Sequence, residues 1–185
     1  MCNNLGYVLC CRGQLDEARG LLRRSLELFR RQQALRNEGL ARTYLAEVEL
    51  RAGDGPAAER EARAAAEVLL GIPSLHAVAA AVLALCLLQQ GRAAEALASA
   101  SAGYAELCEL GSIEEGEALV RLVHAEALAA AGHAAAAATA LGEARARLLA
   151  RAAQINDPVW RDRFLGKVPE NARTLALAAE MGLPG

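Results

Sequence analysis

Gly13-Gln14-Leu15-Asp16-Glu17-Ala18 contains a spacing, glycine followed five residues later by alanine, that returns three more times in the chain. The other copies run from Gly53 to Ala58, from Gly91 to Ala96 and from Gly132 to Ala137. Successive glycines are therefore 40, 38 and 41 residues apart. A repeat of this length, built without alternating polar and β-branched residues, predicts an all-α protein made of stacked helix pairs.

The two residues of this spacing have separate physical roles in a pair of antiparallel helices. A glycine in the left-handed conformation ends the first helix without the steric penalty of a Cβ atom. An alanine near the start of the second helix lets the two axes approach closely. A further small residue lies seven positions before each glycine, in the order Gly6, Ala46, Ala84 and Ala125.

This pattern resembles the tetratricopeptide repeat (TPR), and Asn3-Asn4-Leu5-Gly6 is similar to the opening of its longer, kinesin-light-chain-like variety. The resemblance covers roughly residues 1–153 and implies a TPR-like α-solenoid of about four helix-turn-helix repeats. The expected repeats are about 1–35, 36–73, 74–111 and 112–153. Residues 154–185 are expected to form a C-terminal pair of capping helices.

Local signals predict where several helices begin. Gly55 before Pro56 indicates an N-cap followed by proline at the first helical position, and Ser74 indicates the N-cap of the next helix. Residues 112–115, Ser-Ile-Glu-Glu, have the spacing of a capping box, and Asp157 precedes another proline. The side chains expected to seal the last repeat are Trp160, Phe164, Leu175 and Leu177.

Composition restricts the partners and the compartment. The net charge of −2 gives no general electrostatic attraction to nucleic acid or to an anionic membrane. Arginines between residues 19 and 31 are interleaved with acidic residues, which favours a solvated face over a nucleic-acid stripe.

The apolar stretch from Leu75 to Leu88 is shorter than a bilayer requires. Five cysteines without a C-x-x-C spacing favour reduced thiols and a cytoplasmic location.

The sequence offers no catalytic or cofactor-binding motif. Its only lysine, Lys167, is not part of a phosphate-binding loop, and the kinase strings H-R-D and D-F-G are missing. His76, His124 and His133 are far apart and have no cysteine nearby, so no metal site is expected. His124 is expected to be a core or groove histidine. We therefore predict a protein that is not an enzyme and has no cofactor.

In TPR arrays the first helix of each repeat lines a concave face, and the resemblance places a groove for a protein or peptide segment there. Asparagine and tyrosine side chains suit such a surface because they combine hydrogen bonding with contact area. The basic residues of the family's carboxylate clamp are replaced here by Asn3, Tyr7, Thr43 and Glu47, which argues against that function. The expected partner-binding residues are Asn3, Asn4, Tyr7, Tyr44, Glu47, Arg51, Leu85, Gln89 and Glu126.

The stretch from Asp157 to Ala178 is similar to the C-terminal end of repeat regions in large bacterial signalling proteins, which carry a serine/threonine kinase or a STAND-type ATPase domain. Because the pattern starts without a polar cap, we expect a longer protein, or self-association through the first repeat. The resemblance implies a non-catalytic interaction scaffold. The alternative is an array that senses a peptide or metabolite and regulates an attached domain.

Overall fold

The structure, a computed structural model, describes residues 2–182. This part of the chain forms ten helices and no strand, so the predicted all-α fold is confirmed. The helices are α1 (Cys2–Cys11), α2 (Leu15–Arg31), α3 (Leu35–Ala52), α4 (Gly55–Leu69), α5 (Pro73–Gln89), α6 (Ala93–Leu110), α7 (Glu117–Ala130), α8 (Ala134–Ala153), α9 (Pro158–Lys167) and α10 (Pro169–Glu180).

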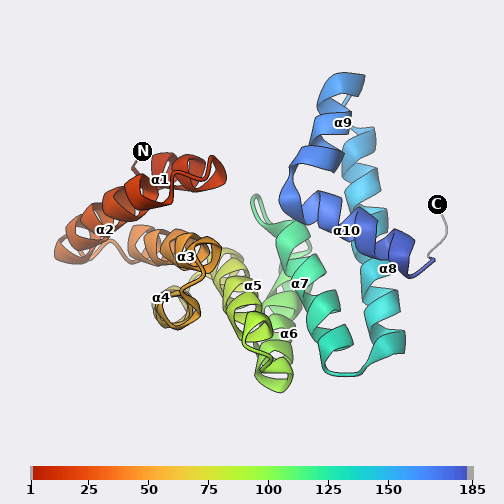
Figure 1. Cartoon of the computed structure of the whole chain (residues 1–185), viewed down its shortest axis with the longest axis horizontal. Coiled ribbons are helices and arrows are strands. Elements are labelled where there is room, and N and C mark those ends of the chain that lie inside the picture. The colour runs from red at the N-terminus through yellow and green to blue at the C-terminus, as the bar shows by residue number, and fades with distance from the viewer. Residues whose placement is uncertain (1, 183–185) are drawn as a thin grey trace.

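The repeated spacing produces four helix pairs, in which α1, α3, α5 and α7 are each followed by an antiparallel partner (Figure 1). All four glycines have positive φ angles, between 73° and 85°, as a helix end of this kind requires. The alanines five residues later are fully or almost fully buried. Together the two small residues allow each chain reversal and each close helix crossing.

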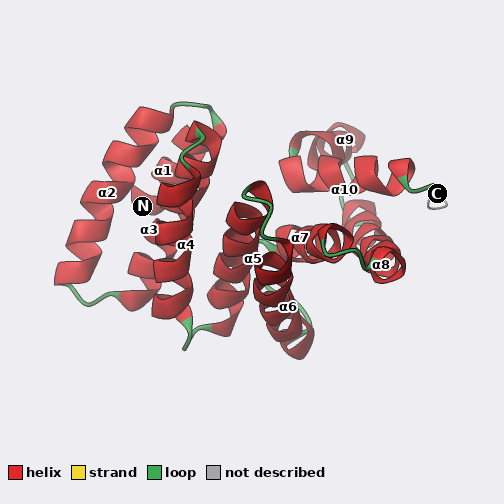
Figure 2. Cartoon of the chain, turned by 60° about the horizontal axis from the view of Figure 1, so that its bottom comes forward, coloured by secondary structure: helices red, strands yellow, loops and turns green. Residues whose placement is uncertain are grey.

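The helix pairs stack so that one set of helices forms a continuous row. We call α1, α3, α5 and α7 the inner helices, because each contacts the next, and α10 packs against α7 at the end of the row. The outer helices α2, α4, α6 and α8 make no contact with one another in the region that the structure describes. Figure 2 shows α2, α3 and α4 side by side and α7 and α8 at a steep angle to them, so the stack turns along its length. The result is a curved solenoid.

Helix α5 is the centre of the core. It packs against α3, α4, α6 and α7, and its buried residues lie on almost every side, from Ala77 to Leu87. Burial on almost every side explains why the α5 sequence is apolar and has little amphipathic character. Gly103 of α6 brings the two helices close together, since a Cβ atom there would lie 2.7 Å from the carbonyl oxygen of Ala77.

Three of the predicted helix starts are wrong. Asp54, rather than Gly55, caps α4 by accepting a hydrogen bond from the Ala57 backbone N–H at 2.9 Å. Helix α5 already begins at Pro73, which leaves Ser74 inside its first turn. The predicted capping box does not form, because residues 112–115 belong to a non-helical link in which the side chain of Ile113 is buried in the core.

The C-terminal helices close the array only partly as predicted. Asp157 caps α9 as expected, accepting from the backbone N–H groups of Val159 and Trp160. Trp160 does not seal the last repeat, however, since it is 60% exposed and α9 has no buried residue. Helix α10 provides the seal: Leu177 and Ala178 pack against α7 and α8 side chains. Phe164 and Leu175 are only partly buried.

Candidate functional site

The inner helices and α10 enclose a groove of about 690 Å³. Its volume lies within the range of about 300–1,000 Å³ that is typical of small-molecule and cofactor sites. A second hollow of about 420 Å³ shares four lining residues with it and extends it along α7 and α10. Apolar side chains contribute much of the lining, and we call them the apolar floor: Val8, Leu40, Leu50, Leu69, Leu75, Val78, Leu85, Leu119 and Leu122.

Most of the residues predicted for the concave face line this groove: Asn4, Tyr7, Tyr44, Glu47, Arg51, Leu85, Gln89 and Glu126. Asn3 lies outside it. Its side chain is buried, and Nδ2 donates a hydrogen bond to the carbonyl oxygen of Asn37 at 3.1 Å. Asn3 therefore joins α1 to the start of α3 and does not face the groove.

Two tyrosines form an aromatic wall at the junction of α1 and α3. The rings of Tyr7 and Tyr44 stack with their centroids 4.8 Å apart and an angle of 27° between their planes. Burial, with a smaller contribution from Glu115, raises the pKa of Tyr44 to about 12. Burial and the nearby Glu47 raise the pKa of Tyr7 still further. Both phenols therefore keep their protons, and the wall is neutral at physiological pH.

Glu47 is the most perturbed acid of the groove. Its pKa is raised to about 7, mainly by burial and also by Glu170, while Arg51 acts in the opposite direction. The Arg51 guanidinium is also within 3.5 Å of the Cys10 carbonyl oxygen. In the described part of the chain Glu47 has no hydrogen-bonding partner of its own. It is a partly buried carboxyl group that is free to interact with a ligand.

Helix α10 and the α6–α7 link (residues 111–116) add groove residues that the sequence did not reveal. Glu115 comes from the link, and Glu170 and Arg173 come from α10. Arg173 Nε donates to Glu126 Oε1 at 3.2 Å, which ties α10 to α7. None of the three belongs to the repeated pattern, so repeat register could not assign them. The only sequence signal was Glu170 directly after Pro169, which indicated the start of a helix but not its location.

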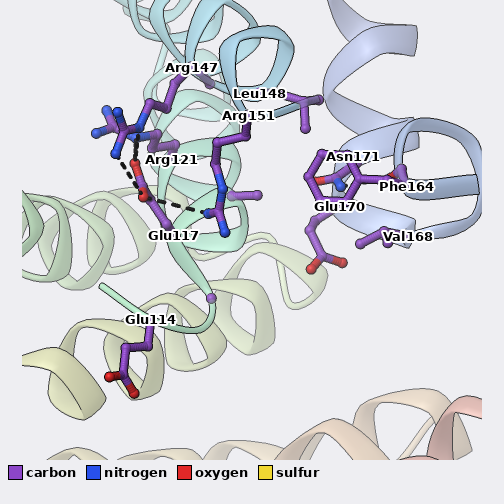
Figure 3. Close-up of a pocket in the computed structure, with 13 residues that line it drawn as sticks. Glu114, Glu117, Arg121, Arg147, Leu148, Arg151, Phe164, Val168, Glu170 and Asn171 are labelled. Carbon is purple, nitrogen blue, oxygen red and sulfur yellow. Dashed lines mark hydrogen bonds and ion pairs between the residues drawn. The ribbon is translucent and has the colours of Figure 1, made fainter. Parts of the chain in front are cut away.

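Carboxylates at the contacts between neighbouring helices are in a very different environment. Glu117, 2% exposed, accepts hydrogen bonds from Arg121 Nε at 3.0 Å and from Arg147 Nε at 2.8 Å, and Arg151 lies 3.6 Å away (Figure 3). Burial alone would raise the pKa of Glu117, but the hydrogen bonds from Arg147 and Arg121 outweigh it and lower the pKa. Three cations surround one carboxylate beside a small hollow of about 110 Å³.

Two other glutamates follow the same rule. Arg19 of α2 holds Glu49 of α3 through Nε and Nη2, both at 2.9 Å to a carboxylate oxygen. Glu59 of α4 accepts from Gln90 and Arg92, at 2.9 Å and 2.7 Å, and the hydrogen bonds from Gln90, Arg63 and Arg92 lower its pKa to about 2. We call Glu49, Glu59 and Glu117 the clamped carboxylates. They connect helices rather than offer a binding site.

The described residues show no cluster of histidine, cysteine and carboxylate side chains that could hold a metal ion. His124 is half-buried and does not line the groove: its ring stacks on that of Tyr104, with the centroids 4.2 Å apart, and burial lowers its pKa. Within residues 2–182, no helix combines the length and the apolar character that crossing a bilayer would require.

Two solved structures match the chain over nearly its whole length. Both contain the nearly identical TPR-like repeats of a predicted kinesin light chain from Podosopora anserina, and one of them is a single-residue variant. Each has a TM-score of 0.64 and 16% identity, over 98% of this chain and 95% of the other. The chain has a TPR-like fold. No family model and no curated protein matches the sequence of this TPR-like array.

Proposed function

We propose that this TPR-like array is a non-catalytic scaffold that binds a segment of another protein in its groove. The observation that carries the proposal is the groove of about 690 Å³, which four inner helices and α10 form together. It combines an apolar floor, a neutral tyrosine wall and polar side chains at its edges. Such a mixture is typical of surfaces that bind peptides, where apolar contacts provide affinity and a few polar groups fix orientation.

A peptide selection tests this function directly. Binders are selected from a random-sequence peptide library on the wild-type chain, and their dissociation constants are measured by fluorescence anisotropy. Gln89→Trp places a large ring at the groove, where Gln89 is exposed, and should weaken binding at least tenfold. The matched control is Gln32→Trp, at the exposed end of α2 and outside the groove. If both variants bind as the wild type does, the groove is not the binding site.

The sensing alternative is favoured by one feature, the return of α10 to the groove. A ligand that contacts both α3 and α10 would connect repeats far apart in sequence and would change the curvature of the stack. Small-angle scattering with and without a selected peptide separates the two functions. A change in the radius of gyration supports sensing, and an unchanged radius supports a scaffold that only binds.

The cellular context and the assembly state are further parts of the proposal. The likeness of residues 157–178 to repeat ends in bacterial signalling proteins supports a cytoplasmic role beside a kinase or ATPase domain. Self-association through the first repeat is supported by Leu5 and Val8, which are 53% and 50% exposed on α1. Sedimentation equilibrium tests this: a dimer that Leu5→Ser converts to a monomer supports it, and a wild-type monomer contradicts it.

A further inference from the structure

We propose that the segment bound in the groove is cationic, with lysine or arginine side chains placed between apolar ones. Three groove carboxylates, those of Glu47, Glu115 and Glu170, have no arginine partner, and we call them unclamped. They would bind the positive charges of the segment, and the apolar floor would contact its apolar side chains. The inference rests on the proposed function and adds the chemistry of the partner to it. It depends on charge complementarity between the groove and its occupant.

The groove has an excess of negative charge. Its acidic residues are Glu47, Glu115, Glu126 and Glu170, and its basic residues are Arg51 and Arg173. Arg173 is already occupied, since it lies 3.2 Å from Glu126 and 3.9 Å from Glu180. Arg51 is therefore the one remaining cation among the described lining residues, and the groove holds three carboxylates outside any ion pair. A segment rich in aspartate or glutamate would be repelled from such a site.

The three unclamped carboxylates reach the groove from three different elements. Glu47 comes from α3, Glu115 from the α6–α7 link and Glu170 from the first turn of α10. Glu170 is near enough to raise the pKa of both Glu47 and Tyr7, and Glu115 raises that of Tyr44. The negative charges therefore surround the tyrosine wall. A single cationic side chain placed beside that wall would interact with more than one of them.

Helix stability alone does not account for this arrangement. Glu170 benefits from the positive end of the α10 dipole, but Figure 3 shows its carboxylate directed away from Arg121 and Arg147, which lie on the other side of the same hollow. Elsewhere in the chain the glutamates that become buried are paired with arginines across helices. Glu47 is partly buried and has no such pair, so the groove retains a desolvated carboxyl group that a bound cation would stabilise.

The apolar floor fits the same kind of side chain. Lysine and arginine have long aliphatic stems that pack along apolar surface while the charged end reaches a polar group. Leu40, Leu50 and Leu119 offer such surface in the same groove as the carboxylates. A purely apolar segment would leave the carboxylates desolvated without compensation, whereas a segment that alternates leucine with lysine satisfies both parts of the groove.

Three synthetic peptides test the inference. They have the same length and the same leucine positions, and the remaining positions are all lysine, all glutamine or all glutamate. Binding to the wild-type chain is measured by fluorescence anisotropy at pH 8. The lysine peptide should bind at least about tenfold more tightly than the glutamine peptide, a difference of about 1.4 kcal/mol, and the glutamate peptide should bind most weakly.

A pair of double variants separates local recognition from general attraction. Glu47→Gln with Glu170→Gln removes two groove charges and should bring the lysine peptide to the affinity of the glutamine peptide. Glu67→Gln with Glu109→Gln removes two charges from exposed positions on α4 and α6, and should leave the preference intact. Circular dichroism melting checks that both variants fold.

Each other outcome overturns the inference. Equal binding of the three peptides, or tighter binding of the glutamine or glutamate peptide, shows that the groove does not select cations. Equal losses in the two double variants show that attraction is not local to the groove. If none of the three peptides binds, the charge inference fails, and the library selection with Gln89→Trp still decides the proposed function independently.

Discussion

Glutamates on the two sides of the inner helices have opposite environments. Where inner helices pack on outer helices, Glu49 and Glu117 are almost fully buried, and each is held by arginines from more than one position. In the groove, Glu47 and Glu170 have no arginine within ion-pairing distance in the described part of the chain. Glu47 and Glu49 are only two residues apart, so one helix presents one carboxylate to each environment.

The difference teaches how the same residue type serves stability in one place and recognition in another. A clamped carboxylate has its hydrogen-bonding capacity filled by the protein, so it is already in its most favourable state. An unclamped carboxylate in a partly buried site has lost water without gaining a partner, and a ligand can supply that partner. Variants that remove a clamped or an unclamped carboxylate, or that free a paired one, measure how these two environments affect stability and binding.

The largest expected effect is the loss of a clamp. Glu117→Ala removes the acceptor of Arg121 and Arg147 and leaves the 15% exposed Arg121 side chain without its partner. We expect a loss of about 2–4 kcal/mol in the free energy of unfolding. The control is Glu115→Ala, two residues earlier and exposed in the link, which should change stability by less than about 0.5 kcal/mol. Urea denaturation followed by circular dichroism measures both. Equal effects would remove the distinction between clamped and unclamped carboxylates.

The second largest effect concerns the small residues that let neighbouring helices cross closely. Ala96 is fully buried where α5 and α6 cross, and Ala96→Leu should cost about 1–3 kcal/mol through overpacking. Gly142→Ala is the control, because a Cβ atom at this position on α8 would meet no atom within 4 Å. It should leave the thermal midpoint unchanged or raise it. An unchanged midpoint for Ala96→Leu would contradict the assigned crossing.

The third effect has the opposite sign. The pKa of Glu47 is about 7 in the fold and 4.5 ordinarily, so the folded state binds its proton more tightly and loses stability as the pH rises between these values. Glu47→Gln cannot ionise, and should be more stable than the wild type by on the order of 1–2 kcal/mol at pH 8, with no gain at pH 4. The titratable groups that interact with Glu47 are Tyr7 and Cys10 of α1, Tyr44 and Arg51 of its own helix, Cys86 of α5 and Glu170 of α10.

Urea denaturation at both pH values measures this difference, with Glu67→Gln on the exposed face of α4 as the control. The control should show no such dependence on pH. A Glu47→Gln variant that is less stable than the wild type at pH 8 would show that Glu47 is clamped after all.

The smallest expected effect on stability comes from a variant that removes the arginine partner of one groove carboxylate. Arg173 is 52% exposed, so its pair with Glu126 contributes at most about 1 kcal/mol, and Arg173→Gln should change the unfolding free energy by less than that. The same variant adds a fourth unclamped carboxylate to the groove. Binding of the lysine peptide should therefore tighten several-fold, which anisotropy measures. Weaker binding would mean that Arg173 contacts the ligand itself.

Much of the fold follows from the sequence because small residues recur at fixed distances. Gly13 and Ala18 set a helix end and a helix crossing whose physical requirements are local, and the same requirements return in each repeat. The inner-helix positions that line the groove repeat with them, which is why the repeat register alone places Tyr7, Tyr44 and Gln89 on one surface.

Features that occur once were not predictable in this way. The α6–α7 link has a helix-like capping box, but burial of Ile113 and the contact of Gly116 with Val78 hold it in a non-helical path. The docking of α10, and with it Glu170 and Arg173, depends on tertiary packing. Trp160 was expected to seal the last repeat, yet the seal uses Ala178 together with the expected Leu177.

Paired charges also recur at a fixed long-range separation in the sequence. Arg19 and Glu49 are 30 residues apart, as are Glu117 and Arg147, and His76 and Glu106, which also pair. This separation matches a contact between neighbouring helices of the array. Two of the three clamped carboxylates, Glu49 and Glu117, have an arginine at that separation.

The return of α10 to the inner helices has a mechanical consequence. Because Tyr7 near the start and Glu170 near the end border the same groove, an occupant would act as a tie between the two ends of the solenoid. An occupant held by α10 would then oppose local unfolding that begins at α1. A fragment that lacks either end would lose the link between the ends and part of the binding surface. Hydrogen exchange at the two termini should slow together when the groove is filled.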